Sequence, residues 1–84
     1  MVRARLRLRI DYYASLRERR GLDGEDIHTD ETNLRQLYAE LAKRHGFPLR
    51  ADQVRPAVND AFCDWDEPLS DGDRVVFVPP VSGG

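Results

Sequence analysis

The C-terminal end of the sequence carries its most distinctive chemistry. It reads Pro79-Pro80-Val81-Ser82-Gly83-Gly84. The prolines favour an extended exit from a folded domain, and glycines, which lack side chains, can enter a narrow channel. The Gly84 carboxylate is then a portable reactive group, since six extended residues reach about 20 Å. A partner could activate it with ATP as an acyl-adenylate, from which a nucleophile displaces AMP.

Other residue types with catalytic potential do not form a recognisable site in the sequence. His28, His45 and Cys63 lack the spacing of metal ligands, so no metal site is expected, and nucleotide-binding and hydrolase motifs are absent from the sequence. Cys63 has no base near it in the sequence and is expected to be a half-buried structural thiol. The sequence therefore predicts a protein that presents its tail to partners and is not an enzyme by itself.

Composition indicates one small globular domain. The 84 residues are 40% hydrophobic and 33% charged, which is ordinary for a folded domain. No apolar run approaches the ~20 residues of a membrane span, and the first residues do not resemble a secretory signal. A net charge of -2 argues against a nucleic-acid partner, and a single cysteine suits a reducing cytoplasm.

Charge is unevenly distributed along the chain. Seven arginines lie between Arg3 and Arg20, whereas seven acids follow Ala51. Either the two groups attract each other within the fold, or they orient a docking partner. Three acids in one expected turn are candidates for steering a partner by long-range attraction: Asp64, Asp66 and Glu67.

Periodicity predicts an α+β domain. Residues 2–13 alternate as a strand with one apolar face, and its other face carries Arg3, Arg5, Arg7 and Arg9. That arginine row is a solvated face, a protected edge or an anion-binding stripe. A helical turn over 14–20 is expected to stop at Gly21, and a weak strand over 25–29 to follow.

The main helix is predicted after Thr32 or Asn33, either of which can cap it. Leu34, Leu37 and Leu41 form its apolar stripe, and Gly46 ends it. A short hairpin over 56–65 and a strand over 74–78 are expected next. The helix should cover one face of the sheet.

Several segments resemble the ubiquitin-like β-grasp sulfur carriers. The stretch from Asp71 to Gly84 resembles the end of the small, sulfur-carrying subunits of molybdopterin synthases. Residues 12–18, Val58-Asn59 and Pro68-Leu69 resemble other parts of these proteins. The related thiamine-pathway carriers usually lack the double proline, so the molybdopterin branch is favoured.

The resemblance implies a β-grasp domain over 1–78, with a mixed sheet of four to five strands and one main helix, and a tail over 79–84. It also implies a catalytic cycle centred on Gly84. An ATP-dependent, E1-like adenylyltransferase activates the carboxylate, and a sulfurtransferase or cysteine desulfurase system converts it to a thiocarboxylate. No cofactor is expected to be bound.

The expected acceptor is cyclic pyranopterin monophosphate, held in the large subunit of molybdopterin synthase. That subunit would carry the catalytic groups of a heterotetramer. Two alternatives remain at this point. One is sulfur delivery to thiamine or cysteine synthesis, and the other is a ubiquitin-like modifier that links Gly84 to lysines of other proteins.

A partner-binding patch is predicted beside the tail. In the strand over 74–78, Phe77 is the better core residue, which places Val78 on the other face beside Tyr13. Phe62 occupies a position that resembles the partner interface of the family. Tyr13, Phe62 and Val78 are therefore expected to form one exposed apolar patch; the alternative buries Phe62 in the core.

Overall fold

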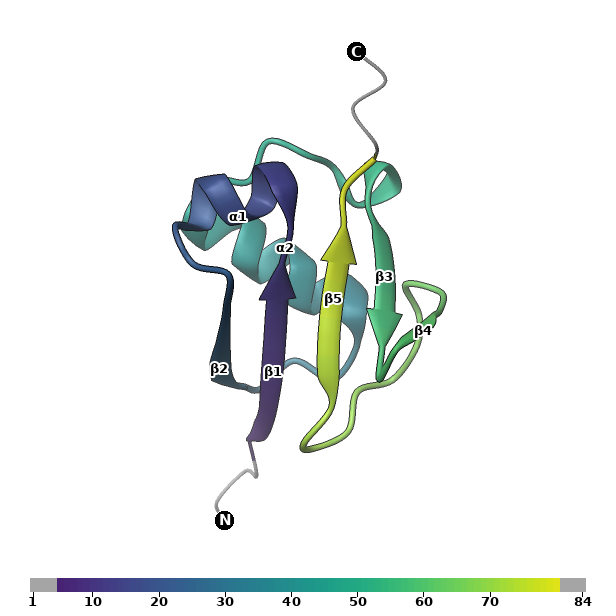
Figure 1. Cartoon of the computed structure of the whole chain (residues 1–84). Helices are drawn as coiled ribbons and strands as arrows, with labels where there is room; N and C mark the ends of the chain where they lie inside the picture. Colours follow the sequence, from purple (N-terminus) through teal and green to yellow (C-terminus); the bar gives the residue numbers. More distant parts are fainter. Residues whose placement is uncertain (1–4, 81–84) are drawn as a thin grey trace.

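The computed structural model describes residues 5–80, and its centre is a five-stranded mixed sheet (Figure 1). The strands are β1 (Leu6–Tyr12), β2 (Gly24–Thr29), β3 (Arg55–Val58), β4 (Ala61–Phe62) and β5 (Arg74–Val78), in the order β2-β1-β5-β3-β4. β1 runs parallel to β5, and every other neighbouring pair is antiparallel. The last strand in sequence therefore lies in the middle of the sheet.

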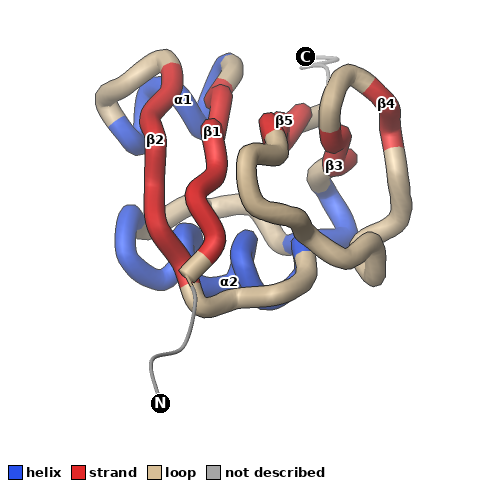
Figure 2. Tube along the Cα trace, turned by 90° about the horizontal axis from the view of Figure 1, so that it is seen from below, coloured by secondary structure: helices blue, strands red, loops and turns tan. Residues whose placement is uncertain are grey.

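Helices connect these strands and cover one face. They are α1 (Ala14–Arg20), α2 (Leu34–His45) and the 3-10 turn η1 (Ala51–Gln53). Asn33 caps α2 by accepting a 2.9 Å hydrogen bond from the Gln36 amide. Gly46 ends α2 at φ 68°, in the left-handed region that favours glycine. Figure 2 shows α2 lying along one side of the strands.

The core lies between α2 and the sheet. Leu8, Ile10 and Tyr12 of β1, together with Val75 and Phe77 of β5, are at most 1% exposed. They pack against the buried stripe of α2, formed by Leu34, Leu37, Tyr38 and Leu41. This arrangement confirms the predicted α+β, β-grasp architecture and the assignment of Phe77 to the core.

The hairpin predicted over 56–65 is shorter than expected. β4 ends at Phe62, and residues 63–65 continue as a loop. The indole of Trp65 explains the difference, because it turns inward and stacks on Phe77 with ring centres 5.8 Å apart. Packing of this partly buried ring against the core favours the loop over further pairing of a short edge strand. In the described part of the chain, no helix is both long and apolar enough to cross a membrane.

Candidate functional site

The tail begins at the middle of the sheet. β5 is hydrogen-bonded to β1 on one side and to β3 on the other, so the backbone is held firmly up to Val78. Pro79 is buried and Pro80 is exposed. Val81, Ser82, Gly83 and Gly84 lie outside the described residues, so the chemistry predicted for Gly84 and the division at residue 78 stay predictions.

Tyr13, Phe62 and Val78 lie on the sheet face opposite α2. Val78 of β5 is paired with Arg55 of β3. Two residues earlier in β5, Val76 is paired with Ala57, which is in turn paired with Phe62 of β4. Cross-strand partners point to the same face. Tyr13 directly follows the residue paired with Phe77, which places it level with Val78.

Exposure of these three residues is unequal. Tyr13 is 50% exposed and Phe62 is 57% exposed, whereas Val78 is half-buried. Phe62 is thus excluded from the core. Val78, which was expected to be exposed, is only partly so. The role of the three residues as a partner interface remains a prediction.

Arg55 is a part of this surface that the sequence did not single out. Its guanidinium carbon lies 4.1 Å from the centre of the Phe62 ring, a cation–π contact. Arg55 is exposed and is the cross-strand partner of Val78. No carboxylate of residues 5–80 forms an ion pair with it.

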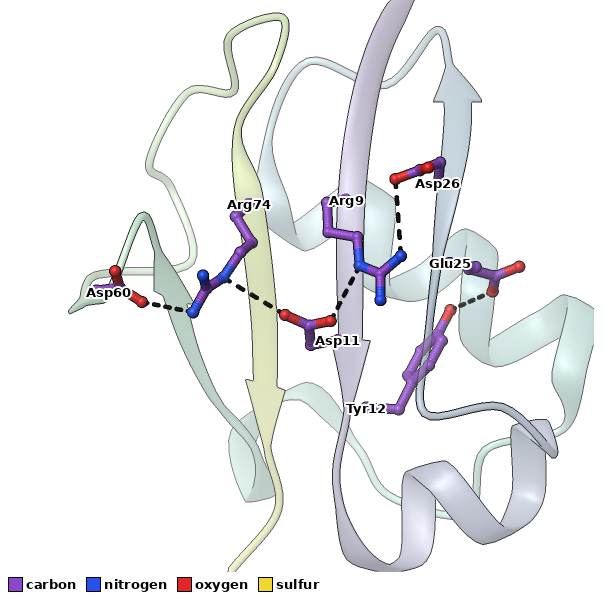
Figure 3. Close-up of polar contacts among 7 residues, drawn as sticks. All are labelled: Arg9, Asp11, Tyr12, Glu25, Asp26, Asp60 and Arg74. Atoms are coloured by element: carbon purple, nitrogen blue, oxygen red, sulfur yellow. Dashed lines mark hydrogen bonds and ion pairs between the residues drawn. The ribbon is translucent and has the colours of Figure 1, made fainter.

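A chain of ion pairs crosses the same sheet face beside the apolar residues (Figure 3). Arg74 bridges Asp60 at 2.7 Å and Asp11 at 3.4 Å. Asp11 in turn accepts a 3.1 Å bond from Arg9 Nε, and Arg9 Nη1 lies 3.9 Å from Asp26. Alternating charges thereby join three strands, β2, β1 and β5, and the turn after β3.

Gly24 makes room for this chain. A Cβ at Gly24 would lie 2.6 Å from Asp11 Oδ1 and 2.7 Å from Arg9 Nη2, closer than atoms can approach. Gly24 is paired with Asp11 in the register of β1 and β2. Only a residue without a side chain lets the carboxylate of Asp11 lie over this strand.

The arginine-rich first part of the chain finds its counter-charges locally. Arg5 pairs with Asp30, Arg17 with Asp23, and Arg20 with Glu25. All three acids lie in the same N-terminal part of the chain as the arginines that they pair with. The two halves of the sequence are joined by fewer pairs, among them the Arg74 to Asp11 bridge. Attraction between the halves is therefore a minor part of the charge pattern.

The three candidate steering acids are all exposed and lie in the loop after β4. Asp66 is 3.2 Å from Arg35 of α2, whereas Asp64 and Glu67 form no ion pair with the described residues. Backbone bonds from Arg35 to Trp65 and from Leu69 to Thr32 hold this loop against the start of α2. The acids are thus exposed to solvent, where their charges can act at long range.

A polar cluster at the β1–β2 edge was not predicted. Arg20 donates from Nε and Nη2 to the two oxygens of Glu25, at 2.8 and 2.7 Å, and Tyr12 OH donates to Glu25 at 2.7 Å. Hydrogen bonds from Arg20 hold the pKa of Glu25 below its usual range. Burial, with Glu25 close by, raises the pKa of Tyr12. The cluster ties α1 to β2 and is structural, because its groups are all mutually satisfied.

Cys63 matches its predicted role as a half-buried thiol. Burial raises its pKa, and the nearby carboxylates of Glu67 and Asp64 raise it further. A raised pKa disfavours the thiolate, which is the nucleophilic form. Within residues 5–80, no three His, Cys, Asp or Glu side chains gather as they would around a metal ion.

Comparisons with known proteins cover nearly the whole chain. A curated relative, the molybdopterin synthase sulfur carrier subunit of Escherichia coli, is 35% identical over 92% of this chain and 99% of its own length. A solved structure described as molybdopterin converting factor subunit 1 from Pyrococcus furiosus is 36% identical, with a TM-score of 0.76, and covers 90% of this chain and 99% of that one.

A second solved structure is described as a complex. It contains subunits 1 and 2 of the molybdopterin-converting factor from Helicobacter pylori, and its matching chain is 26% identical, with a TM-score of 0.64. The match covers 94% of this chain and 100% of that one. The family model described as the ThiS family matches residues 10–84, which include the whole tail. The chain therefore belongs to the ThiS family.

Proposed function

We propose that this protein is the sulfur carrier of molybdenum cofactor biosynthesis. The observation that carries the proposal is full-length similarity, at 35% identity, to a curated sulfur carrier subunit of molybdopterin synthase. The family match continues through Gly84, the residue that would carry sulfur. The fold is suited to this role because a central strand leads directly into the tail.

The proposed chemistry takes place on the Gly84 carboxylate. In an E1-like adenylyltransferase, a carboxylate oxygen attacks the α-phosphorus of ATP, and pyrophosphate leaves. The outer sulfur of a persulfide on a sulfurtransferase or cysteine desulfurase then attacks the acyl carbon, and AMP leaves with the oxygen. A thiol next cleaves the S–S bond of this acyl disulfide, which releases the thiocarboxylate and leaves the donor sulfur in a new disulfide. The resulting thiocarboxylate gives its sulfur to cyclic pyranopterin monophosphate in the large subunit. Water returns the carrier to the carboxylate.

The proposed partner in the final step is the large subunit of molybdopterin synthase. The complex of subunits 1 and 2 from Helicobacter pylori supports this choice. Tyr13, Phe62 and Val78 are proposed as the apolar docking patch, because Tyr13 and Phe62 are half exposed and all three lie on the sheet face from which Val78 leads into the tail. Exposed aromatic side chains of this kind supply much of the energy of interfaces.

Charge is proposed to set the speed of docking. The acids Asp64, Asp66 and Glu67 are exposed, so their attraction to a basic partner surface would act before contact. Each exposed pair contributes only about 0–1 kcal/mol. The apolar patch therefore sets most of the affinity, and the three acids set most of the association rate.

Blocking the tail tests the carrier mechanism. A variant with one alanine appended after Gly84 should fold as the wild type does, because no core residue is touched. It should form no thiocarboxylate with the adenylyltransferase and sulfur donor, which intact mass measures as the replacement of one oxygen by sulfur. A blocked chain that still acquires sulfur and supports molybdopterin synthesis would show the mechanism to be wrong.

A further inference from the structure

Arg55 places an isolated positive charge within the proposed docking patch. Its guanidinium lies over the Phe62 ring at 4.1 Å from the centre, and its strand position is directly opposite Val78. Its neighbours in this corner are therefore an aromatic ring and an aliphatic side chain. On the same face, Arg9 and Arg74 are each held by two carboxylates, and Arg7, which forms no ion pair with the described residues, lies toward the other end of β1, away from the tail. Arg55 has no such carboxylate among the described residues.

The contact with Phe62 fixes the direction in which Arg55 can bind. A guanidinium that stacks on a ring uses its flat face and leaves its N–H groups along the edge free to donate. The ring thus orders the side chain before a partner arrives, so little conformational entropy is lost on binding. The free edge presents a planar fork of donors, which matches a carboxylate.

Docking over Phe62 and Val78 would remove water from Arg55. A charge that loses water without gaining a partner is costly, and the cost is offset only by an opposite charge with good hydrogen bonds. The partner surface that covers the patch must therefore supply that charge. Resting on the proposed function, we infer that the large subunit presents an aspartate or glutamate to Arg55, in a bidentate pair enclosed by apolar contacts.

This pair would select the correct partner. A partner with a lysine or an apolar residue at that point would leave Arg55 buried and unpaired, so it would bind more weakly. The requirement is opposite in sign to that of Asp64, Asp66 and Glu67, which favour basic surroundings. The large subunit would then carry one acid at the centre of its docking surface and basic residues outside it.

The test measures the dissociation constant of the full-length carrier and the purified large subunit of the same organism by calorimetry. Arg55→Met keeps a chain of similar length over Phe62 and removes the charge. We expect it to raise Kd at least about tenfold, with a smaller rise for Arg55→Lys, which keeps the charge but not the fork. Arg44→Met is the matched control, since Arg44 is exposed on α2, and its Kd should stay within about twofold.

Charge exchange identifies the acid. The carrier variant Arg55→Glu should bind the wild-type large subunit weakly. Acids on the docking surface of the large subunit are then replaced one at a time, Asp→Arg or Glu→Arg, and only the replacement at the acid that pairs with residue 55 should restore affinity. Failure to recover affinity at any position would overturn the inference. Wild-type affinity in Arg55→Met would also overturn it, because Arg55 would then only cover the ring.

Phe62→Ala separates this inference from the proposed docking patch. If Phe62→Ala weakens binding while Arg55→Met does not, the patch stands without the pair; if neither does, the patch itself is wrong.

Discussion

Replacing Phe62 with alanine should separate binding from stability. An aromatic side chain buries about 150–250 Å² when fully enclosed. Because Phe62 is 57% exposed, a partner that covers it would bury roughly 100 Å² more of it. At about 25 cal/mol per Å², this area contributes about 2.5 kcal/mol. Kd for the large subunit should therefore rise about 60-fold, at 1.4 kcal/mol per tenfold.

The free carrier should tolerate the same change. Its exposed ring contributes to the fold mainly through the cation–π contact with Arg55, worth about 0.5–1 kcal/mol at the surface. Urea denaturation should therefore show a loss of less than about 1 kcal/mol in the free energy of unfolding. Truncation of a fully buried aromatic residue costs about 3–5 kcal/mol, which gives a clear contrast.

Calorimetric titration of the large subunit with each variant gives the affinity. Leu22→Ala is the control, because Leu22 is 41% exposed and precedes β2, at the opposite edge of the sheet from β4. Its Kd should equal that of the wild type. The reasoning would be refuted by a Phe62→Ala variant that binds as tightly as the control, or by one that loses as much stability as a core truncation.

Three further predictions concern the charged groups. Gly24→Ala should cost about 1–3 kcal/mol of unfolding free energy, because the new Cβ displaces Asp11; unchanged urea denaturation would contradict this. Glu25 has a lowered pKa through Arg20, so its stabilising effect is present above about pH 4.3 and is lost as pH falls through its folded pKa. Glu25→Gln should lower stability at pH 7 and flatten the acid limb of a pH–stability curve. Neutralising the three steering acids together should slow association in stopped flow and weaken its salt dependence, with dissociation unchanged. The steering proposal fails if neither changes. The acids are Asp64, Asp66 and Glu67.

Most of the fold could be predicted because its signals are local. The alternation along β1, the leucine stripe of α2 and its Asn33 cap each depend on residues close in sequence. The order of the strands could not be obtained in this way. Insertion of β5 beside β1 depends on contacts between distant residues, and periodicity carries no information about which strands pair.

Parts of the candidate site could likewise be predicted from the sequence, and other parts could not. The tail could be found from composition, the outward-facing Tyr13 from strand alternation, and Phe62 from its resemblance to a family position. Arg55 and the ion-pair chain could not, since each depends on cross-strand register. Gly24 is a further case, because only the register of β1 and β2 shows that its missing side chain leaves the space for the carboxylate of Asp11.

The central position of β5 ties the reactive end of this protein to the completion of its fold. Within the sheet, the pair of β1 with β2 and the pair of β3 with β4 are joined only through the last strand. A chain truncated before Arg74 would lose its tail and leave an edge of β1 and an edge of β3 unpaired. Such a fragment would also lack Val78, and its sheet would be left in two pieces that no strand joins. Folding itself would thus discriminate against incomplete chains.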